Sequence, residues 1–503
     1  MRKIRNTIIQ LYVLFVMMIL PVLVHDSYRD IRNFKVQVFW MVFKVALPVL
    51  AVLLVVDLIM HIRDDGLSET LSKIKEKITP LDFSVLAFFF IVLCSCLTSR
   101  YGKHAFTGDL TFKVGGYLLM ALAVMFVITS QCLDSDMKIS YFWAPIVLFL
   151  EATAILNSLD IDPLHMQIPG MTLSQHVYFI STIGHIDYLS EYFCLFIPFY
   201  ATLLIKADKK QDQILFGTIT FLGYLISLLI RANGMILGNG VGFFMLGLYC
   251  LKKKGYLTRY LMQFYLLAIA GVLTDLINRL YIIPAKQLEL DAAPTLFLKY
   301  KLYIVIAVVV LVLTLLLKKV KDEDKLITVL SKVKTVLLAL FVVGVVGFVS
   351  FAVYCTFANK QPAIFNNRIN IWRGCVESFK HMSVREKLIG VGPNCVSDML
   401  NHYAVYQGVL RTTAHNEFLE YFLSIGILGV TSYVCVFVFT LKAALKGGNF
   451  AYVAGLAAYI GISFVIGPSF LNTVTLWTYL ALAILSTKTL SVPQEMPSSE
   501  VKN

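Results

Sequence analysis

A histidine and two glutamates stand at the start of an apolar run in the C-terminal part of the sequence. The polar residues are His415, Asn416, Glu417 and Glu420. A histidine can remove a proton from a hydroxyl group near neutral pH, so His415 is a candidate general base, with Glu417 as the next candidate. A helix N-terminus disfavours protonated histidine whereas nearby acids favour it, and the sequence leaves that balance open. The plainer alternatives are an interfacial polar residue for His415 and first-turn helix residues for the acids.

The composition is that of a membrane protein. Of the 503 residues, 58% are hydrophobic and only 15% are charged, and the mean hydropathy is +0.76. Apolar runs of about 20 residues, the length that a helix needs to cross a bilayer, recur along nearly the whole chain. These runs are continuous rather than alternating, which favours helices over barrel strands. We therefore expect an all-α polytopic membrane protein.

Fourteen transmembrane helices are predicted. They cover residues 8–24, 39–60, 81–98, 114–132, 139–156, 186–205, 213–231, 234–251, 260–283, 300–317, 333–355, 417–440, 450–466 and 470–486. Helices 1 to 11 thus lie within 1–356, a large polar loop spans 357–414, helices 12 to 14 lie within 415–487, and a disordered tail spans 488–503. The loop is too long for a simple turn, and the tail is short and polar.

The distribution of lysine and arginine predicts the orientation. With the N-terminus in the cytoplasm, the basic clusters fall on the cytoplasmic side, whereas residues 157–185 on the other side contain neither lysine nor arginine. Both termini are then cytoplasmic, and the loop 357–414 lies on the outer face of the inner (plasma) membrane. Two groups of basic residues oppose this count. They are Arg29, Arg32 and Lys35, and Arg100, Lys103 and Lys113.

The net charge of +13 does not indicate nucleic-acid binding. The charges are spread over several loops instead of being gathered with aromatic residues on one domain. Anionic lipids of the inner leaflet are the expected partners. Cys375 and Cys395 share the large loop, where a disulfide between them is one alternative and two thiols the other.

The histidine belongs to a longer pattern. His415 and Asn416, nine further residues, and then Gly426 and Gly429 give H-N-x9-G-x-x-G. This pattern resembles the signature of the bacterial O-antigen ligase and O-antigen polymerase superfamily. In a continuous helix His415 and both glycines would share one stripe, and the glycines would permit close helix packing.

Three upstream stretches are similar to other elements of that family. "NNRINIWRG" resembles its Arg-x-x-x-Trp element through Arg368 and Trp372, and "LIGVGPNCV" resembles its Gly-x-Gly stretch. "LLIRANGMILGNGVGFF" is similar to the family's arginine between two central helices, here Arg231. "GHIDYLSEYF" is similar to a family position that lines the cavity. Its polar residues, possible acceptor contacts, are His185, Asp187 and Glu191.

The resemblance implies a GT-C-like helical bundle in which the arginines engage the diphosphate of a polyprenyl-linked glycan. A planar, permanently charged guanidinium suits that task, although Arg231 could instead reach lipid head groups and Arg368 could be a solvated loop charge. Trp372 could stack on a sugar or anchor the loop. No metal or other cofactor is expected.

The activity implied is transfer of a glycan from a polyprenyl (undecaprenyl) diphosphate carrier to a sugar hydroxyl in surface polysaccharide assembly. The protein would be an inverting glycosyltransferase in which His415 activates the acceptor. The acceptor could be a lipid A-core, as for a ligase, or another lipid-linked repeat, as for an O-antigen or capsule polymerase. A protein O-oligosaccharyltransferase is a third possibility. A flippase or other transporter is the alternative from a different class, since many spans and glycine-interrupted helices suit one.

Overall fold

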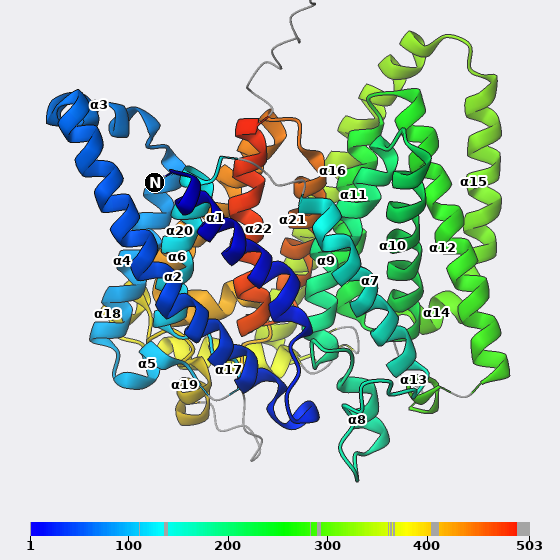
Figure 1. The fold of residues 1–503 in the computed structure, drawn as a ribbon. Helices are drawn as coiled ribbons and strands as arrows, with labels where there is room; N and C mark the ends of the chain where they lie inside the picture. The colour runs from blue at the N-terminus through cyan, green and yellow to red at the C-terminus, as the bar shows by residue number, and fades with distance from the viewer. Residues whose placement is uncertain are drawn as a thin grey trace, which may run out of the picture.

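The structure is helical throughout the part of the chain that it describes. It is a computed structural model that describes residues 2–109, 111–134, 139–281, 283–288, 293–360, 362, 365, 368–403 and 412–489. These residues contain helices, turns and loops but no strand. The long helices stand side by side in a bundle (Figure 1). The prediction of an all-α polytopic membrane protein is confirmed.

Twelve helices among the described residues are long and apolar enough to cross a membrane, and two shorter apolar helices accompany them. Each predicted span coincides with one of these helices. They are α1 (Arg2–Leu14) continued by η1 (Phe15–Ile19) and η2 (Leu20–Val22), α2 (Ser27–Asp65), α4 (Pro80–Thr98), α6 (Gly116–Cys132), α7 (Ile139–Ser158), α9 (Ile186–Lys206), α10 (Lys210–Leu229), α11 (Asn233–Cys250), α12 (Lys254–Leu280), α15 (Leu302–Lys319), α16 (Glu323–Ala358), α20 (Glu417–Lys446), α21 (Phe450–Ser463) and α22 (Phe470–Thr489).

Short helices fill the connections. They are α3 (Leu67–Lys77), α5 (Lys103–Thr107), α8 (Leu173–Tyr178), α13 (Pro284–Gln287), α14 (Ala293–Lys299), α17 (Arg368–Lys380), α18 (Val384–Ile389) and α19 (Val396–Tyr403). The predicted large loop therefore contains three helices, α17 to α19, and its residues 404–411 lie outside the described residues. The predicted tail lies outside them from residue 490 onward, whereas Lys488 and Thr489 still belong to α22.

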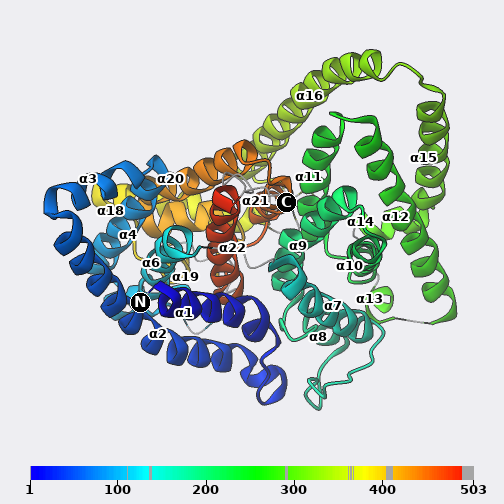
Figure 2. The same ribbon diagram turned by 45° about the horizontal axis from the view of Figure 1, so that its top comes forward.

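Two helices extend well beyond their predicted spans. α2 has 39 residues and α16 has 36, because charged and polar residues continue each helix past its apolar part. Hydropathy detects only the portion that suits hydrocarbon, so it underestimates such helices. α15 and α16 lie at the edge of the bundle (Figure 2), and only 6% of the most apolar part of α16 is buried within the protein. An apolar helix with so little protein contact is suited to lipid.

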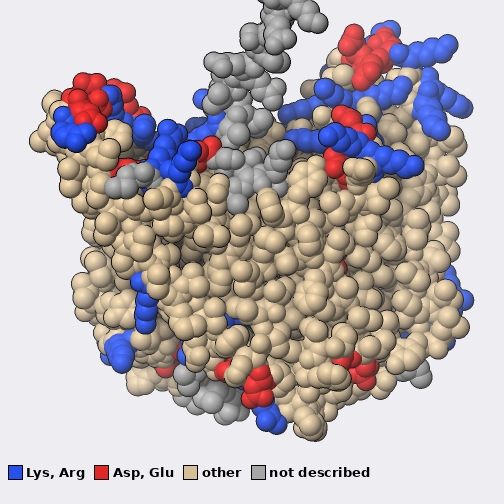
Figure 3. Space-filling view, viewed as in Figure 1, with Lys and Arg blue, Asp and Glu red and all other residues tan. Residues whose placement is uncertain are grey.

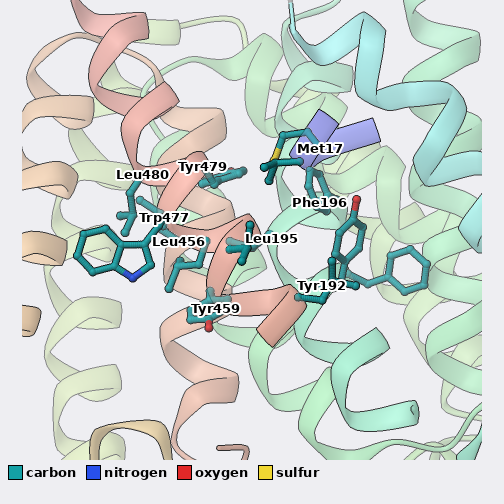
Figure 4. Packing of buried hydrophobic residues seen from close by; sticks show 14 of the residues in the cluster. Met17, Tyr192, Leu195, Phe196, Leu456, Tyr459, Trp477, Tyr479 and Leu480 are labelled. Atoms are coloured by element: carbon teal, nitrogen blue, oxygen red, sulfur yellow. The ribbon is translucent and has the colours of Figure 1, made fainter. Parts of the chain in front are cut away.

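The bundle is packed around α21. Every residue of α21 except Ile460 is buried, and its main neighbours are α9 and α11. The contact depends on glycine: a Cβ on Gly455 would lie 2.3 Å from the carbonyl oxygen of Leu195 in α9. Figure 4 shows aromatic residues that pack nearby, Tyr192 and Phe196 from α9 and Trp477 and Tyr479 from α22. This rigid centre positions the ends of α9, α21 and α22, where the polar residues described below gather.

The two ends of the bundle differ in charge. Lys and Arg gather along the edge that carries α3 and the α15–α16 connection, at the top of Figure 3, and fewer appear at the opposite edge. We call these the basic side and the loop side, since α8, α13 and α17 to α19 lie at the second (Figure 1). Two of the residues that opposed the charge count have fixed contacts at the loop side. Arg100 pairs with Glu386, and Lys35 donates hydrogen bonds to the carbonyls of Pro21 and Thr182.

Candidate active site

The chain enters α20 through a capped turn. The side-chain oxygen of Asn416 accepts a hydrogen bond of 2.9 Å from the backbone N–H of Leu419, which makes Asn416 the N-cap of α20. His415 precedes it with a φ of 47°, in the left-handed region that residues other than glycine seldom adopt. Residues held in such conformations cluster at functional sites, where the surrounding contacts must maintain them.

Glu420 maintains the backbone in front of His415. Its buried carboxylate accepts hydrogen bonds from the backbone N–H of Ala414 at 2.8 Å and from the hydroxyl of Thr413 at 3.1 Å. The Thr413 hydroxyl in turn accepts a 3.4 Å hydrogen bond from the backbone N–H of His415. Glu420 therefore does more than occupy the first helical turn: it reaches back and fixes the approach to the histidine.

Glu417 is a buried anchor. Its carboxylate accepts hydrogen bonds from the Tyr459 and Ser463 hydroxyls, each at 3.0 Å, and a further one from Tyr433. The residue is fully buried. These contacts tie the start of α20 to α21. As a fallback general base Glu417 is poorly placed, because all three contacts enclose it in the bundle.

Trp372 joins α17 to the histidine segment. Its indole N–H donates a hydrogen bond of 3.1 Å to the carbonyl oxygen of Ala414, the residue before His415. The ring also lies edge-on against Phe365, with centroids 5.7 Å apart. Of the two predicted roles, these contacts match the loop anchor.

Arg368 lies one turn before Trp372 at the start of α17. Its Nε donates a hydrogen bond of 2.9 Å to the carbonyl oxygen of Val465, between α21 and α22. Its two terminal nitrogens have no partner among the described residues. Burial lowers the pKa of this guanidinium, and the Asp187 carboxylate opposes that shift. A fixed guanidinium whose terminal N–H groups are unused can receive an oxyanion in a bidentate manner.

The three polar residues predicted as acceptor contacts at the start of α9 have different environments in the structure. His185 is the N-cap, and its Nδ1 accepts a hydrogen bond of 3.2 Å from the backbone N–H of Asp187. Burial lowers the pKa of His185, which favours the neutral ring that this hydrogen bond requires. Glu191 is fully buried and accepts a hydrogen bond from Asn472 of α22. Asp187 is partly exposed and acts electrostatically on Arg368, whereas Glu191 belongs to the interior and does not suit contact with an acceptor.

Arg231 occupies the bend between α10 and α11. Its φ is 54°, its exposed fraction is 8%, and it donates a hydrogen bond of 3.2 Å to the carbonyl oxygen of Ala285. Burial lowers the pKa of this guanidinium. A Cβ on Gly234, three residues later, would lie 3.4 Å from Ile466, the neighbour of the Val465 that binds Arg368. Arg368 thus binds the α21–α22 connection directly, whereas Arg231 binds Ala285 and Asn278 and only the following helix α11 packs against that connection.

The glycine pattern has a different role from the predicted one. α20 is interrupted at Gly426, where φ is 71° and ψ is −178°. Gly390 and Gly392 cross this break, and the backbone N–H of Gly392 donates a hydrogen bond of 2.9 Å to Ser424. The prediction of one continuous stripe from His415 through Gly426 and Gly429 is therefore wrong, because the helix changes course before Gly429. Gly426 permits close packing against the loop and not against another spanning helix.

One group in the described residues could hold a metal ion. His104, Cys395 and Asp398 bring potential ligand atoms within 4.8 Å of one another, and none of them was a predicted site residue. Cys375 and Cys395 are both free thiols. Burial is the largest cause that raises the pKa of each thiol, so both favour the protonated form.

The sequence pattern did not identify the hydrogen bonds from Thr413 and Ala414 to Glu420. It also did not identify the contact of Gly390 and Gly392 with the break at Gly426. The sequence signal for the contact of Glu420 with Thr413 and Ala414 was the short separation of these residues across a helix start. The charge count also pointed to an unusual group of basic residues, because Arg29, Arg32 and Lys35 fall on the side where few basic residues were expected.

Fold and site together define a polytopic membrane protein whose histidine, arginines and aspartate gather at one end of the bundle. Residues 294–434 match the family model described as O-antigen ligase. This match confirms the resemblance predicted from the sequence and supports membership of the O-antigen ligase and polymerase superfamily, with a role in surface polysaccharide assembly. The matched segment contains His415, Arg368 and Trp372 but not Arg231. A search of curated proteins finds no match.

Proposed function

We propose that the protein transfers a glycan from a polyprenyl diphosphate carrier to a hydroxyl group of a glycan acceptor. The observation that carries this proposal is the hydrogen bond between Trp372 and Ala414. It fixes the start of α17, which bears Arg368, next to the backbone of His415. In this proposal the contact keeps Arg368, the cation for the leaving diphosphate, near His415, the base for the entering hydroxyl.

In the proposed reaction the acceptor oxygen attacks the anomeric carbon of the lipid-linked sugar. A new carbon–oxygen bond forms as the bond to the diphosphate breaks, and polyprenyl diphosphate leaves. The proton of the acceptor hydroxyl passes to the imidazole of His415. The terminal nitrogens of Arg368 neutralise the charge that develops on the leaving group, with Arg231 contributing from the α10–α11 bend. Direct displacement inverts the anomeric centre.

The arginines make a metal unnecessary in this proposal, because they supply positive charge where the diphosphate departs. Asp187 suits a contact to the acceptor or to Arg368, whose charged form it favours. The basic side faces the cytoplasm, so that both termini lie there and the reaction takes place on the outer face of the inner membrane. Anionic lipids then contact the basic side.

A purified sample in detergent tests the proposal. It is given a lipid-linked oligosaccharide with, in separate reactions, lipid A-core, a second lipid-linked repeat, or a protein acceptor. Joined product together with free polyprenyl diphosphate supports the transferase, and the productive acceptor distinguishes ligase, polymerase and protein glycosyltransferase. Donor that stays intact with every acceptor, but crosses the bilayer when the protein is reconstituted in vesicles, would establish the transporter instead.

A further inference from the structure

A pocket of about 250 Å³ lies at the loop side between the start of α2, the start of α9 and the start of α22. We call it the α2 pocket. Among its lining residues are Arg29, Arg32, Lys35, Tyr188 and Ser469. No residue of the proposed transfer site, His415, Arg231 or Arg368, lines it. Its volume corresponds to roughly eight water molecules at about 30 Å³ each, which is more than a bare oxyanion needs.

Three cations face this pocket from one helix. Arg29, Arg32 and Lys35 follow one another at intervals of three residues, so they lie along one side of α2. Among the described residues, no carboxylate comes within 4 Å of any of them. Asp30, the acid between the first two, pairs with His25 instead. The group therefore carries positive charge that no direct ion pair neutralises.

Lys35 is the most buried of the three. Its side chain is only 2% exposed, and its ammonium donates hydrogen bonds of 2.6 Å to the carbonyl oxygens of Pro21 and Thr182. Carbonyl dipoles satisfy its N–H groups but supply no counter-charge, and buried charges are normally paired. Arg32 is held nearby, where it donates to the carbonyl of Thr111 and lies 5.7 Å from the ring centroid of Tyr188. Arg32 and Lys35 are thus held by the fold at the pocket, and the exposed Arg29 lines it as well.

The pocket also has an unused neutral hydrogen-bonding group. The hydroxyl of Ser469 is buried and has no hydrogen-bond partner among the residues that the structure describes. Such a group is costly to leave unsatisfied. Together with the cations and the Tyr188 ring, it provides contacts for an oxyanion attached to a polar or ring-containing body.

We propose that the α2 pocket binds a phosphoryl group carried on a ligand of about monosaccharide size, with Arg29 and Arg32 as its direct charge contacts. Lys35 holds the wall of the pocket through its hydrogen bonds to Pro21 and Thr182. The same chemistry is offered by a sugar phosphate of a glycan and by the head group of an anionic phospholipid. This site goes beyond the proposed transfer reaction, and its binding can be measured whether or not transfer occurs.

The test uses the full-length protein in nanodiscs of phosphatidylcholine. Glucose 1-phosphate is titrated by calorimetry, and phosphatidylglycerol binding is followed by native mass spectrometry. Arg29→Gln, with or without Arg32→Gln, should weaken the bound probe by about tenfold or more, since a charge-assisted hydrogen bond contributes roughly 1.5–3 kcal/mol. Arg63→Gln is the matched control, because Arg63 lies in the same helix and pairs with Asp64 at its far end.

Each result has a defined meaning. Loss of glucose 1-phosphate binding in the Arg29 variant, with Arg63→Gln unchanged, supports the site and assigns it to a sugar phosphate. The same loss for phosphatidylglycerol alone supports the site and assigns it to a lipid head group. Wild-type protein that binds neither probe, or an Arg29→Gln variant of unchanged thermal stability that binds both as tightly as the wild type, overturns the proposal.

Discussion

Gly390 and Gly426 lie where two backbones cross, each in a conformation that suits glycine. A Cβ on Gly390 would lie 2.1 Å from the carbonyl oxygen of Ser424, and a Cβ on Gly426 would lie 2.3 Å from the backbone of Leu388. Their φ values are 83° and 71°, respectively. The break in α20 and the loop after α18 therefore fit together only if both positions lack a side chain. This crossing holds α18 and the loop after it, which lie between α17 and α19, against α20, the helix that follows His415.

Gly426→Ala should destabilise the protein strongly. An alanine would have to adopt a left-handed φ and would also meet backbone atoms that cannot move aside, so we expect a loss of about 2–4 kcal/mol. The measurement is the thermal transition of the purified protein in detergent. Gly344→Ala is the control, because a Cβ there has nothing within 4 Å and the residue lies in the exposed part of α16. Equal transitions for both variants would mean that the crossing is not rigid.

Trp372→Phe should reduce transfer with little effect on the amount of folded protein. Phenylalanine retains the ring contact with Phe365 but loses the hydrogen bond to Ala414, which contributes about 1 kcal/mol. We expect transfer to fall by about tenfold or more, since displacement of a reacting group by about 1 Å can cost about 10²-fold. Trp40→Phe is the control, because the Trp40 indole has no hydrogen-bond partner among the described residues. Full transfer by Trp372→Phe would remove this link from the site.

The ion pair between Arg100 and Glu386 should make the loop side sensitive to acid. Burial raises the pKa of Glu386, but hydrogen bonds from Arg100 and Ser383 outweigh it and hold that pKa below its usual value. A depressed folded-state pKa means that the stabilisation is complete above the unfolded-state pKa and is lost as the pH falls through the folded-state pKa. Thermal transitions of the wild type should therefore fall between pH 7 and pH 3 by more than those of Glu386→Gln.

Glu377→Gln serves as the comparison for this pH dependence. Glu377 pairs with Lys380 on the exposed surface of α17, where an ion pair contributes little. This variant should follow the wild-type pH profile. If Glu386→Gln also follows it, the contact with Arg100 does not contribute to stability in the assembled protein.

Sequence reasoning predicted the helices better than the site, and the reason is physical. A span such as α21 is specified by its own apolar residues, so its position can be read locally. The break at Gly426 depends on Leu388, which lies far away along the chain and meets it only after folding. The hydrogen bond from Ala414 to Glu420 likewise depends on a turn whose direction the sequence pattern does not specify. Residue types and spacing identified His415 and Arg368, whereas the contacts that hold them required the structure.

Arg368→Lys tests whether the geometry of the cation matters. Lysine keeps the charge but has a single ammonium in place of a planar pair of N–H groups, so it cannot retain the contact with Val465 and also bind an oxyanion in a bidentate manner. We expect donor turnover to fall by roughly tenfold or more with normal membrane abundance. Arg373→Lys, on the same helix α17, is the matched control. Unchanged turnover in Arg368→Lys would exclude the residue from diphosphate binding.

His415→Asn provides the sharpest test of the proposed chemistry. The left-handed backbone at this position limits the choice of replacement, and asparagine tolerates that conformation better than alanine or glutamine. Asparagine keeps a polar side chain but has no basic nitrogen, so it separates proton removal from the backbone requirement. Transfer should fall by about 10²-fold or more, the usual scale for a lost general base, and the lipid-linked donor should remain uncleaved.

The matched control for this variant is His165→Asn. His165 is also a histidine in the left-handed region, with a φ of 51°, and it lies in an exposed turn of another loop. If this control and His415→Asn have the same thermal transition but only His415→Asn loses transfer, the loss comes from the imidazole and not from the backbone. Near-normal turnover in His415→Asn would mean that His415 only orients the acceptor. Because Glu417 is enclosed by Tyr459 and Ser463, the base would then have to be sought at Asp187, the carboxylate that raises the pKa of Arg368.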